Sequence, residues 1–176
     1  MLEVCDTLED SLLIKMGVEF GLRRSDITNL MISDAHIEER MLYFIERKKG
    51  NRIRKLPIRT SLLVGLKQFI NTIRDRKTLF SFKSDKTAYN RVNEIYCKAG
   101  YSKKIVTEKN GVKKTRFEPS FPFHALRGTC YKRLRAEGRS LEFAAAWLGD
   151  TVAVATEHYG TVTDAELEDA IRKEDL

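Results

Sequence analysis

The spacing of apolar residues in the first part of the chain predicts two helices. Positions that should line the core face of the longer one are Leu8, Leu12, Leu13, Met16 and Phe20. Thr7 can cap this helix with its hydroxyl, and Gly21 can end it. After a tight turn, Ser25 or Asp26 can begin a short second helix. Its apolar side would contain Ile27, Leu30 and Met31.

Between residues 35 and 58 the pattern changes to the period of strands. Leu42 and Phe44, followed by Ile53 and Leu56, are apolar positions separated by polar ones. Residues 48–51, Lys-Lys-Gly-Asn, have the composition of a turn. The segment therefore predicts a small antiparallel sheet with a lysine-rich tip.

The remaining segments predict mainly helices. Their spans are residues 60–74, 85–99, 123–137 and 140–147, a short segment from Thr151, and a final amphipathic segment 163–175. Thr60 or Ser61 can cap the first of these and Ser140 the fourth. Residues 101–119, centred on Asn110 and Gly111, predict a basic β-hairpin, with a disordered loop as the alternative. We therefore predict a mainly helical α+β fold, in which a small antiparallel β-sheet packs on a helical core.

Composition and charge restrict the class of partner. The chain has 176 residues, enough for one domain with a core, and its net charge is +7 with a pI of about 9.3. Basic residues gather in the ranges 47–59, 98–116 and 127–139, whereas residues 164–176 are mostly acidic. This distribution favours an anionic partner, of which nucleic acid is the commonest. A mildly basic protein without such a partner is the alternative.

Cysteine use and hydropathy indicate the cellular compartment and the kinds of site that we expect. Cys5, Cys97 and Cys130 are far apart and form no metal-ligand pattern with histidine, so we expect reduced thiols in a cytosolic protein and no metal or cofactor. No apolar run approaches the ~20 residues of a membrane span, and no signal peptide is visible.

The strongest candidates for chemistry are His124 and Arg127. They are three residues apart, so on a helix they share a face. Apolar flanks would partly desolvate both side chains and strengthen their hold on an anion. A core histidine bonded to backbone is the alternative.

Three other candidates are weaker when each is taken separately. Arg23 stands at a helix start, where its guanidinium could bind phosphate, or it could be a surface arginine paired with Asp26. Lys49 lies at a hairpin tip that could reach a DNA groove, with Lys48 as a competitor and a solvated turn lysine as the alternative. Tyr159 could be a nucleophile or a packing tyrosine.

The order and spacing of these residues resemble the catalytic domain of the tyrosine recombinase, or phage integrase, family. The matching segments are 21–26 with Arg23, 49–58 with Lys49, 124–129 with His124 and Arg127, and 148–150 followed nine residues later by Tyr159. They cover nearly the whole chain in the family's order. The resemblance identifies residues 1–176 as one catalytic domain, and the family's N-terminal DNA-clamping domain as absent from this sequence.

The resemblance implies metal-independent cleavage and rejoining of DNA through a 3′-phosphotyrosyl intermediate. Tyr159 would be the nucleophile, Arg23 and Arg127 would hold the phosphate, and Lys49 and His124 would assist proton transfer. Asp26 would support Arg23.

One position departs from the family pattern. Asp150 stands where the family has a histidine or tryptophan that donates a hydrogen bond to the phosphate. An ionised aspartate has no such donor, so either Trp147 or His158 would supply it or the site would cleave more slowly.

The expected partner is double-stranded DNA. Contacts to its phosphates are predicted for Lys48, Arg52, Arg54 and Lys55. Self-association on DNA, as a dimer or tetramer through the C-terminal helix, is expected from the resemblance, in a cytoplasmic protein without a membrane contact. The alternatives are a DNA-binding relative impaired in cleavage, a type IB topoisomerase-like enzyme, and an RNA-binding helical domain.

Overall fold

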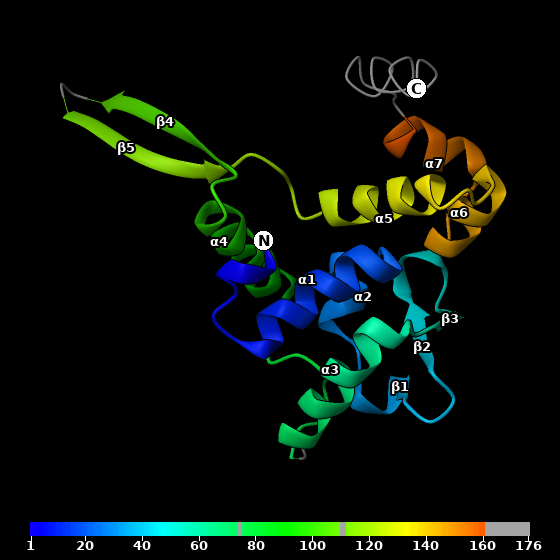
Figure 1. Cartoon of the computed structure of the whole chain (residues 1–176). Coiled ribbons are helices and arrows are strands. Elements are labelled where there is room, and N and C mark those ends of the chain that lie inside the picture. Colours follow the sequence, from blue (N-terminus) through cyan, green and yellow to red (C-terminus); the bar gives the residue numbers. More distant parts are fainter. Residues whose placement is uncertain (74, 110–111, 161–176) are drawn as a thin grey trace, which may run out of the picture. The chain divides into compact units, whose positions relative to one another are not determined.

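The computed structural model describes residues 1–73, 75–109 and 112–160 (Figure 1). In chain order, the α-helices are α1 (Leu8–Phe20), α2 (Arg24–Thr28), α3 (Thr60–Thr72), α4 (Asp85–Lys98), α5 (Ala125–Ala136), α6 (Leu141–Leu148) and α7 (Val152–Tyr159). The strands are β1 (Ala35–His36), β2 (Met41–Glu46), β3 (Arg52–Pro57), β4 (Ser102–Lys109) and β5 (Val112–Pro119). Short 3-10 turns are η1 (Leu2–Val4), η2 (Ile32–Asp34) and η3 (Arg47–Lys49). The mainly helical α+β prediction is confirmed.

The chain divides into two compact units, Met1–Cys130 and Tyr131–Leu176. Helix α5 begins in the first unit and ends in the second. The first unit contains the three-stranded sheet and the long hairpin, and the second contains α6 and α7, which pack on each other. Whether the whole chain acts as one catalytic domain stays a prediction.

Helix α1 is the centre of the first unit and packs against α3 and α4. The hydroxyl of Thr7 accepts a hydrogen bond from the amide of Asp10, and Gly21 ends the helix with a left-handed φ of 60°, as predicted. The buried face of α1 meets apolar residues from the other elements of this unit. Buried members include Leu12, Leu13, Met16, Phe20, Ile27, Leu42, Leu66 and Phe80.

The sheet has the order β1-β2-β3, with antiparallel pairs throughout the described strands. Its lysine-rich turn is confirmed: η3 follows β2, and Gly50 and Asn51 both adopt positive φ, 73° and 60°. Along β2 the side chains of Leu42, Phe44 and Glu46 are buried. This alternation places Glu46 on the core face, because side chains two apart along a strand share a face.

The predicted N-cap of α3 is wrong. Neither Thr60 nor Ser61 is its N-cap; that position belongs to Arg59, which makes no side-chain cap bond. The helix therefore starts without the predicted side-chain cap. Helix α4 instead has a side-chain cap, because the hydroxyl of Ser84 accepts from the amide of Thr87.

The basic hairpin is confirmed against the alternative of a disordered loop. Strands β4 and β5 pair in register from Ser102 opposite Pro119 to Lys109 opposite Val112. Its apolar residues Val106 and Phe117 are exposed, and β5 contacts α4 (Figure 1). The predicted turn residues Asn110 and Gly111 lie outside the described residues.

In the second unit the cap predicted at Ser140 is present, and α7 has a side-chain cap as well. Ser140 caps α6 and Thr151 caps α7, each accepting a hydrogen bond from an amide three residues on. The predicted helix over residues 163–175 lies outside the described residues. Within the part of the chain that is described, no helix is long and apolar enough to span a bilayer.

Candidate active site

Arg23 is placed by the turn between two helices. Gly21 ends α1, Leu22 is buried, and Arg23 is the extended N-cap residue of α2. Its guanidinium Nη1 donates to Oε1 of Glu46 at the end of β2. The Arg23 side chain is 13% exposed, whereas that of Glu46 is fully buried. The arginine is therefore fixed from the side of the sheet and still reaches the surface.

Asp26 lies in the same charged cluster. It is 4% exposed, and burial raises the pKa of its carboxyl above the ordinary 3.8. The guanidinium of Arg23 opposes this increase in pKa, and the carboxylate of Glu46 adds to it. Two buried carboxylates therefore act on Arg23, and sequence reasoning found only Asp26. The available signal for Glu46 was its strand register with Leu42 and Phe44.

Two further arginines are buried in this unit. Arg127, 2% exposed, donates through Nη1 to the carbonyl of Gly21, two residues before Arg23. Arg54, 8% exposed, lies over the ring of Phe44 at 5.4 Å. Burial lowers the pKa of Arg54; Glu46 opposes this decrease, and Arg127 and Arg23 add to it. These groups therefore share one electrostatic environment.

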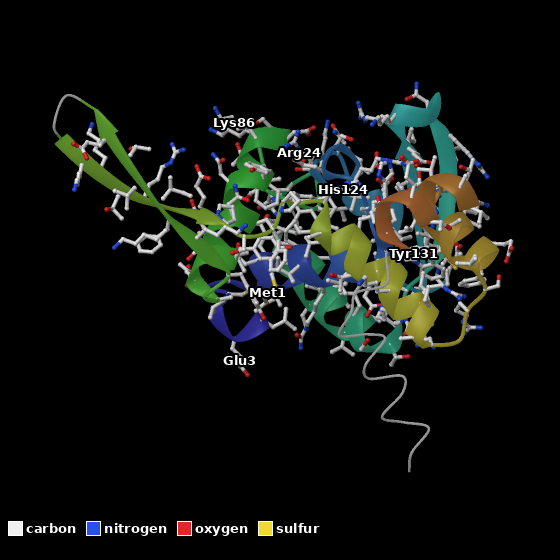
Figure 2. All side chains as sticks on the ribbon, turned by 90° about the horizontal axis from the view of Figure 1, so that it is seen from above. Met1, Glu3, Arg24, Lys86, His124 and Tyr131 are labelled. Carbon is white, nitrogen blue, oxygen red and sulfur yellow. The ribbon has the colours of Figure 1, made fainter. Side chains whose placement is uncertain are left out.

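A pocket of about 320 Å³ opens beside this cluster. Its lining comes from α2, the lysine turn, α4 and the segment before α5. The lining residues are Arg23, Arg24, Ser25, Lys48, Asp85, Tyr89, Pro122, Phe123 and His124. Figure 2 shows the labelled side chains of Arg24 and His124 near each other in this unit. Cationic groups that lie far apart in the sequence thus converge on one concave surface, as anion recognition requires.

The expectation that apolar flanks desolvate both His124 and Arg127 is wrong for His124. His124 is exposed, and it immediately precedes the first residue of α5 rather than lying within the helix. Its carbonyl accepts from the amide of Arg127, at 3.0 Å, so the two residues form the first turn. Arg127 is buried against the Gly21 carbonyl, and His124 lines the pocket.

The lysine-rich hairpin separates the predicted DNA contacts into two groups. Lys48, Arg52 and Lys55 are exposed, and the Lys55 ammonium lies 4.7 Å from the ring centroid of Tyr43. Arg54 is buried among the charges described above. The side chain of Lys49 lies outside what the structure describes, so Lys48 is the lysine whose place at the pocket is established.

The remaining predicted residues belong to the second unit. Tyr159 is the last residue of α7 and is 8% exposed, with its ring centroid 5.8 Å from that of Tyr131. His158 is exposed, and its ring centroid is 6.1 Å from that of Tyr159.

Trp147 and Asp150 lie around the end of α6. Trp147 is half-buried and stacks with Phe143 at 5.8 Å. The amide of Asp150 donates to the carbonyl of Ala145, which closes the C-terminal turn of the helix.

Solved structures with the same architecture are recombinases and integrases. The crystal structure of XerA recombinase matches 98% of this chain and 59% of that chain, with a TM-score of 0.75 and 18% identity. The integrase of mycobacterium phage Brujita has a TM-score of 0.66 at 17% identity, over 95% of this chain and 58% of that chain. XerH bound to palindromic difH substrate has a TM-score of 0.68 at 18% identity, over 99% of this chain and 49% of that chain. The fold is that of tyrosine recombinase catalytic domains.

Sequence comparison assigns the family. Residues 1–166 match the model of the Phage integrase family, so the chain belongs to that family. The tyrosine recombinase XerA of Pyrococcus horikoshii is 28% identical over 176 residues, which is all of this chain and 58% of that protein. XerD of Listeria innocua is 23% identical over 168 residues, 94% of this chain and 54% of that protein. The chain thus spans little more than half the length of these relatives.

Proposed function

We propose that this chain is the strand-cleaving domain of a tyrosine site-specific recombinase that acts on double-stranded DNA without a metal. The observation that carries the proposal is the convergence of Arg23 and His124, 101 positions apart in the sequence numbering, on one pocket of a phage integrase family member. Solved relatives include recombinases bound to DNA, which supports DNA as the substrate.

The proposed first step is a transesterification. The phenolate of Tyr159 attacks the phosphorus of a backbone phosphodiester, a Tyr–O–P bond forms, and the bond to the 5′ oxygen breaks. The products are a 3′-phosphotyrosyl link and a 5′-hydroxyl. Because the bond energy is kept in the link, another 5′-hydroxyl can reverse the reaction and rejoin the strand.

The proposed roles of the cationic groups follow from charge. Negative charge grows on the non-bridging oxygens in the transition state, and Arg23 and Arg127 would stabilise it. Lys49, with Lys48 as the alternative, would protonate the leaving 5′ oxygen, and His124 would act as general base or hydrogen-bond partner. A phenol with an ordinary pKa of ~10 needs such help at neutral pH.

The proposed DNA contacts extend beyond the pocket. Lys48, Arg52 and Lys55 are exposed on the β2–β3 hairpin, and exposed lysines also lie along β4 and β5. Such residues bind phosphates, so affinity should fall steeply with salt. We further propose self-association on DNA through residues 163–175, and a cytoplasmic, DNA-associated protein.

The test is covalent trapping on nicked duplexes. A pool with randomised sequence is used, in which a nick close to the cleavage point lets the short 5′-hydroxyl strand diffuse away. We expect a protein–DNA adduct that survives denaturant and disappears after protease treatment.

Tyr159→Phe is the matched variant, since it removes only the hydroxyl, and it should abolish the adduct. If the wild-type chain binds duplex DNA but forms no adduct with any member of the pool, the proposed cleavage is wrong. A DNA-binding relative would then be the better description.

A further inference from the structure

The ion pair between Arg23 and Glu46 joins the candidate pocket to the core of the sheet. Glu46 is fully buried at the last position of β2, and its Oε1 accepts from Nη1 of Arg23. We infer that Glu46 is a positioning residue, which holds the guanidinium of Arg23 in the orientation that binds the scissile phosphate. This inference rests on the proposed function.

The burial of Glu46 calls for a reason beyond folding. Its neighbours on the same face of β2 are Leu42 and Phe44, so an apolar residue would suit this position. A carboxylate removed from water is costly unless charged partners compensate, and an apolar replacement is often at least as stable. An apolar side chain of similar volume would therefore stabilise this position about as well, and the distinctive effect of the carboxylate is on Arg23.

The charges around Glu46 fit a role in positioning. Arg23 and Arg54 act on it as cations, and Asp26 acts as a second anion. Within the described part of the chain, Oε2 of Glu46 is buried and has no hydrogen-bond partner. The carboxylate is thus directed at Arg23 through one oxygen rather than satisfied by a network at the end of the strand.

This arrangement can orient an arginine and still leave N–H donors available for a phosphate. A guanidinium has five N–H donors in a planar fork, enough to bond a carboxylate on one side and a phosphate on another. An ion pair at one nitrogen restricts the orientations that the planar fork can adopt. Donors aligned before the reaction stabilise a transition state more than donors that must reorient during it.

The first measurement does not depend on cleavage. In the full chain, the Nε–Hε NMR signal of Arg23, assigned by its loss in Arg23→Lys, should show the high ¹H–¹⁵N NOE of an ordered side chain. In Glu46→Gln, which keeps the shape and loses the charge, the NOE should fall. An unchanged NOE in a folded Glu46→Gln variant overturns the inference even if the chain never cleaves DNA.

The second measurement asks whether the lost order affects chemistry. On a duplex from the trapping experiment, Glu46→Gln should form the adduct about 10–100-fold more slowly, somewhat less than the loss of a transition-state donor. A methylphosphonate at the cleavage position removes the charge that Arg23 would stabilise. The ratio of wild-type to Glu46→Gln rates should therefore shrink on that substrate.

Asp10→Asn is the matched control. Asp10 is also buried and forms an ion pair with Arg91 at 2.6 Å in the same unit, but neither residue lines the candidate pocket. The Asp10→Asn substitution should lower the thermal stability of the chain without changing the rate of adduct formation or the NOE of Arg23. If Glu46→Gln slows adduct formation equally on both substrates, the role of Glu46 is merely structural. If Glu46→Gln forms the adduct faster than wild type, Glu46 holds Arg23 back from the phosphate. Either result overturns the inference. Failure of wild-type cleavage with an intact NOE difference would instead overturn the proposed function.

Discussion

Gly17, in the middle of α1, permits a close approach that helps to place Arg127. A Cβ added at Gly17 would lie 2.7 Å from Cδ1 and 3.1 Å from Cβ of Leu126, the residue before Arg127. The carbonyl of Gly17 accepts from the amide of Gly21, whose own carbonyl accepts from Arg127. The last turns of α1 and its C-cap Gly21 therefore contact two consecutive residues of α5.

The substitution Gly17→Ala sets two energies against each other. Alanine in a helix interior stabilises by about 1 kcal/mol relative to glycine. Overpacking a filled core typically costs about 1–3 kcal/mol, and here the crowded Cβ of Leu126 belongs to the start of its side chain and cannot rotate away. The net expectation is a loss of about 0–2 kcal/mol in the free energy of unfolding.

A double-mutant cycle isolates the contact. Leu126 is 2% exposed, so Leu126→Ala by itself should cost about 2–5 kcal/mol. In the double variant the methyl group added at position 17 no longer meets Cδ1 and fills part of the space. The double variant should therefore lose less stability than the sum of the two single losses, by about 1–2 kcal/mol. Urea unfolding followed by far-ultraviolet circular dichroism measures all four proteins.

Gly65→Ala in α3 is the matched control. A Cβ there would lie 3.8 Å from Cδ2 of Leu12, an ordinary contact, so this variant should be up to about 1 kcal/mol more stable than wild type. If Gly17→Ala gains as much as Gly65→Ala and the cycle with Leu126→Ala is additive, the close approach has no energetic consequence and the reasoning fails.

Two further predictions concern charge. Burial raises the pKa of Asp26, which means that the folded state binds this proton more tightly than the unfolded state does. The stabilisation from the protonated carboxyl is therefore fully present below pH 3.8 and is lost as the pH rises through the raised pKa. The difference in unfolding free energy between wild type and Asp26→Asn should then move against wild type as the pH rises from 3.8; the opposite trend would mean that attraction to Arg23 outweighs burial. For Asp150, replacement by histidine restores a donor, so Asp150→His should trap DNA at least as fast as wild type in the nicked-duplex assay. A large fall in trapping would reveal a role for the aspartate.

Local patterns were enough for most of the elements. Thr7, Ser140 and Gly21 act where the sequence placed them, because caps and left-handed turns depend on a few neighbouring residues. The lysine turn and the long hairpin were also found from adjacent residues. The missed start of α3 shows the limit of this approach, since two plausible cap residues were present and neither acts as the N-cap.

The candidate site was only partly visible in the sequence. Spacing identified Arg23, His124 and Arg127, and the fold brings all three into one unit. Spacing could not show that His124 is exposed while Arg127 is buried, because the difference depends on what packs against the start of α5. Lys48 lines the pocket because of the shape of the turn that carries it, and composition does not specify that shape.

The sequence by itself determined the family, most of the elements and the set of cationic residues, since these depend on residue order and short-range periodicity. Only the tertiary structure decided that Glu46, 23 positions after Arg23, is its carboxylate partner. That pairing depends on the register of β2 and on its packing beside α2. The alternation along β2 can place Glu46 on the buried face, but only the assembled core brings the guanidinium of Arg23 to it.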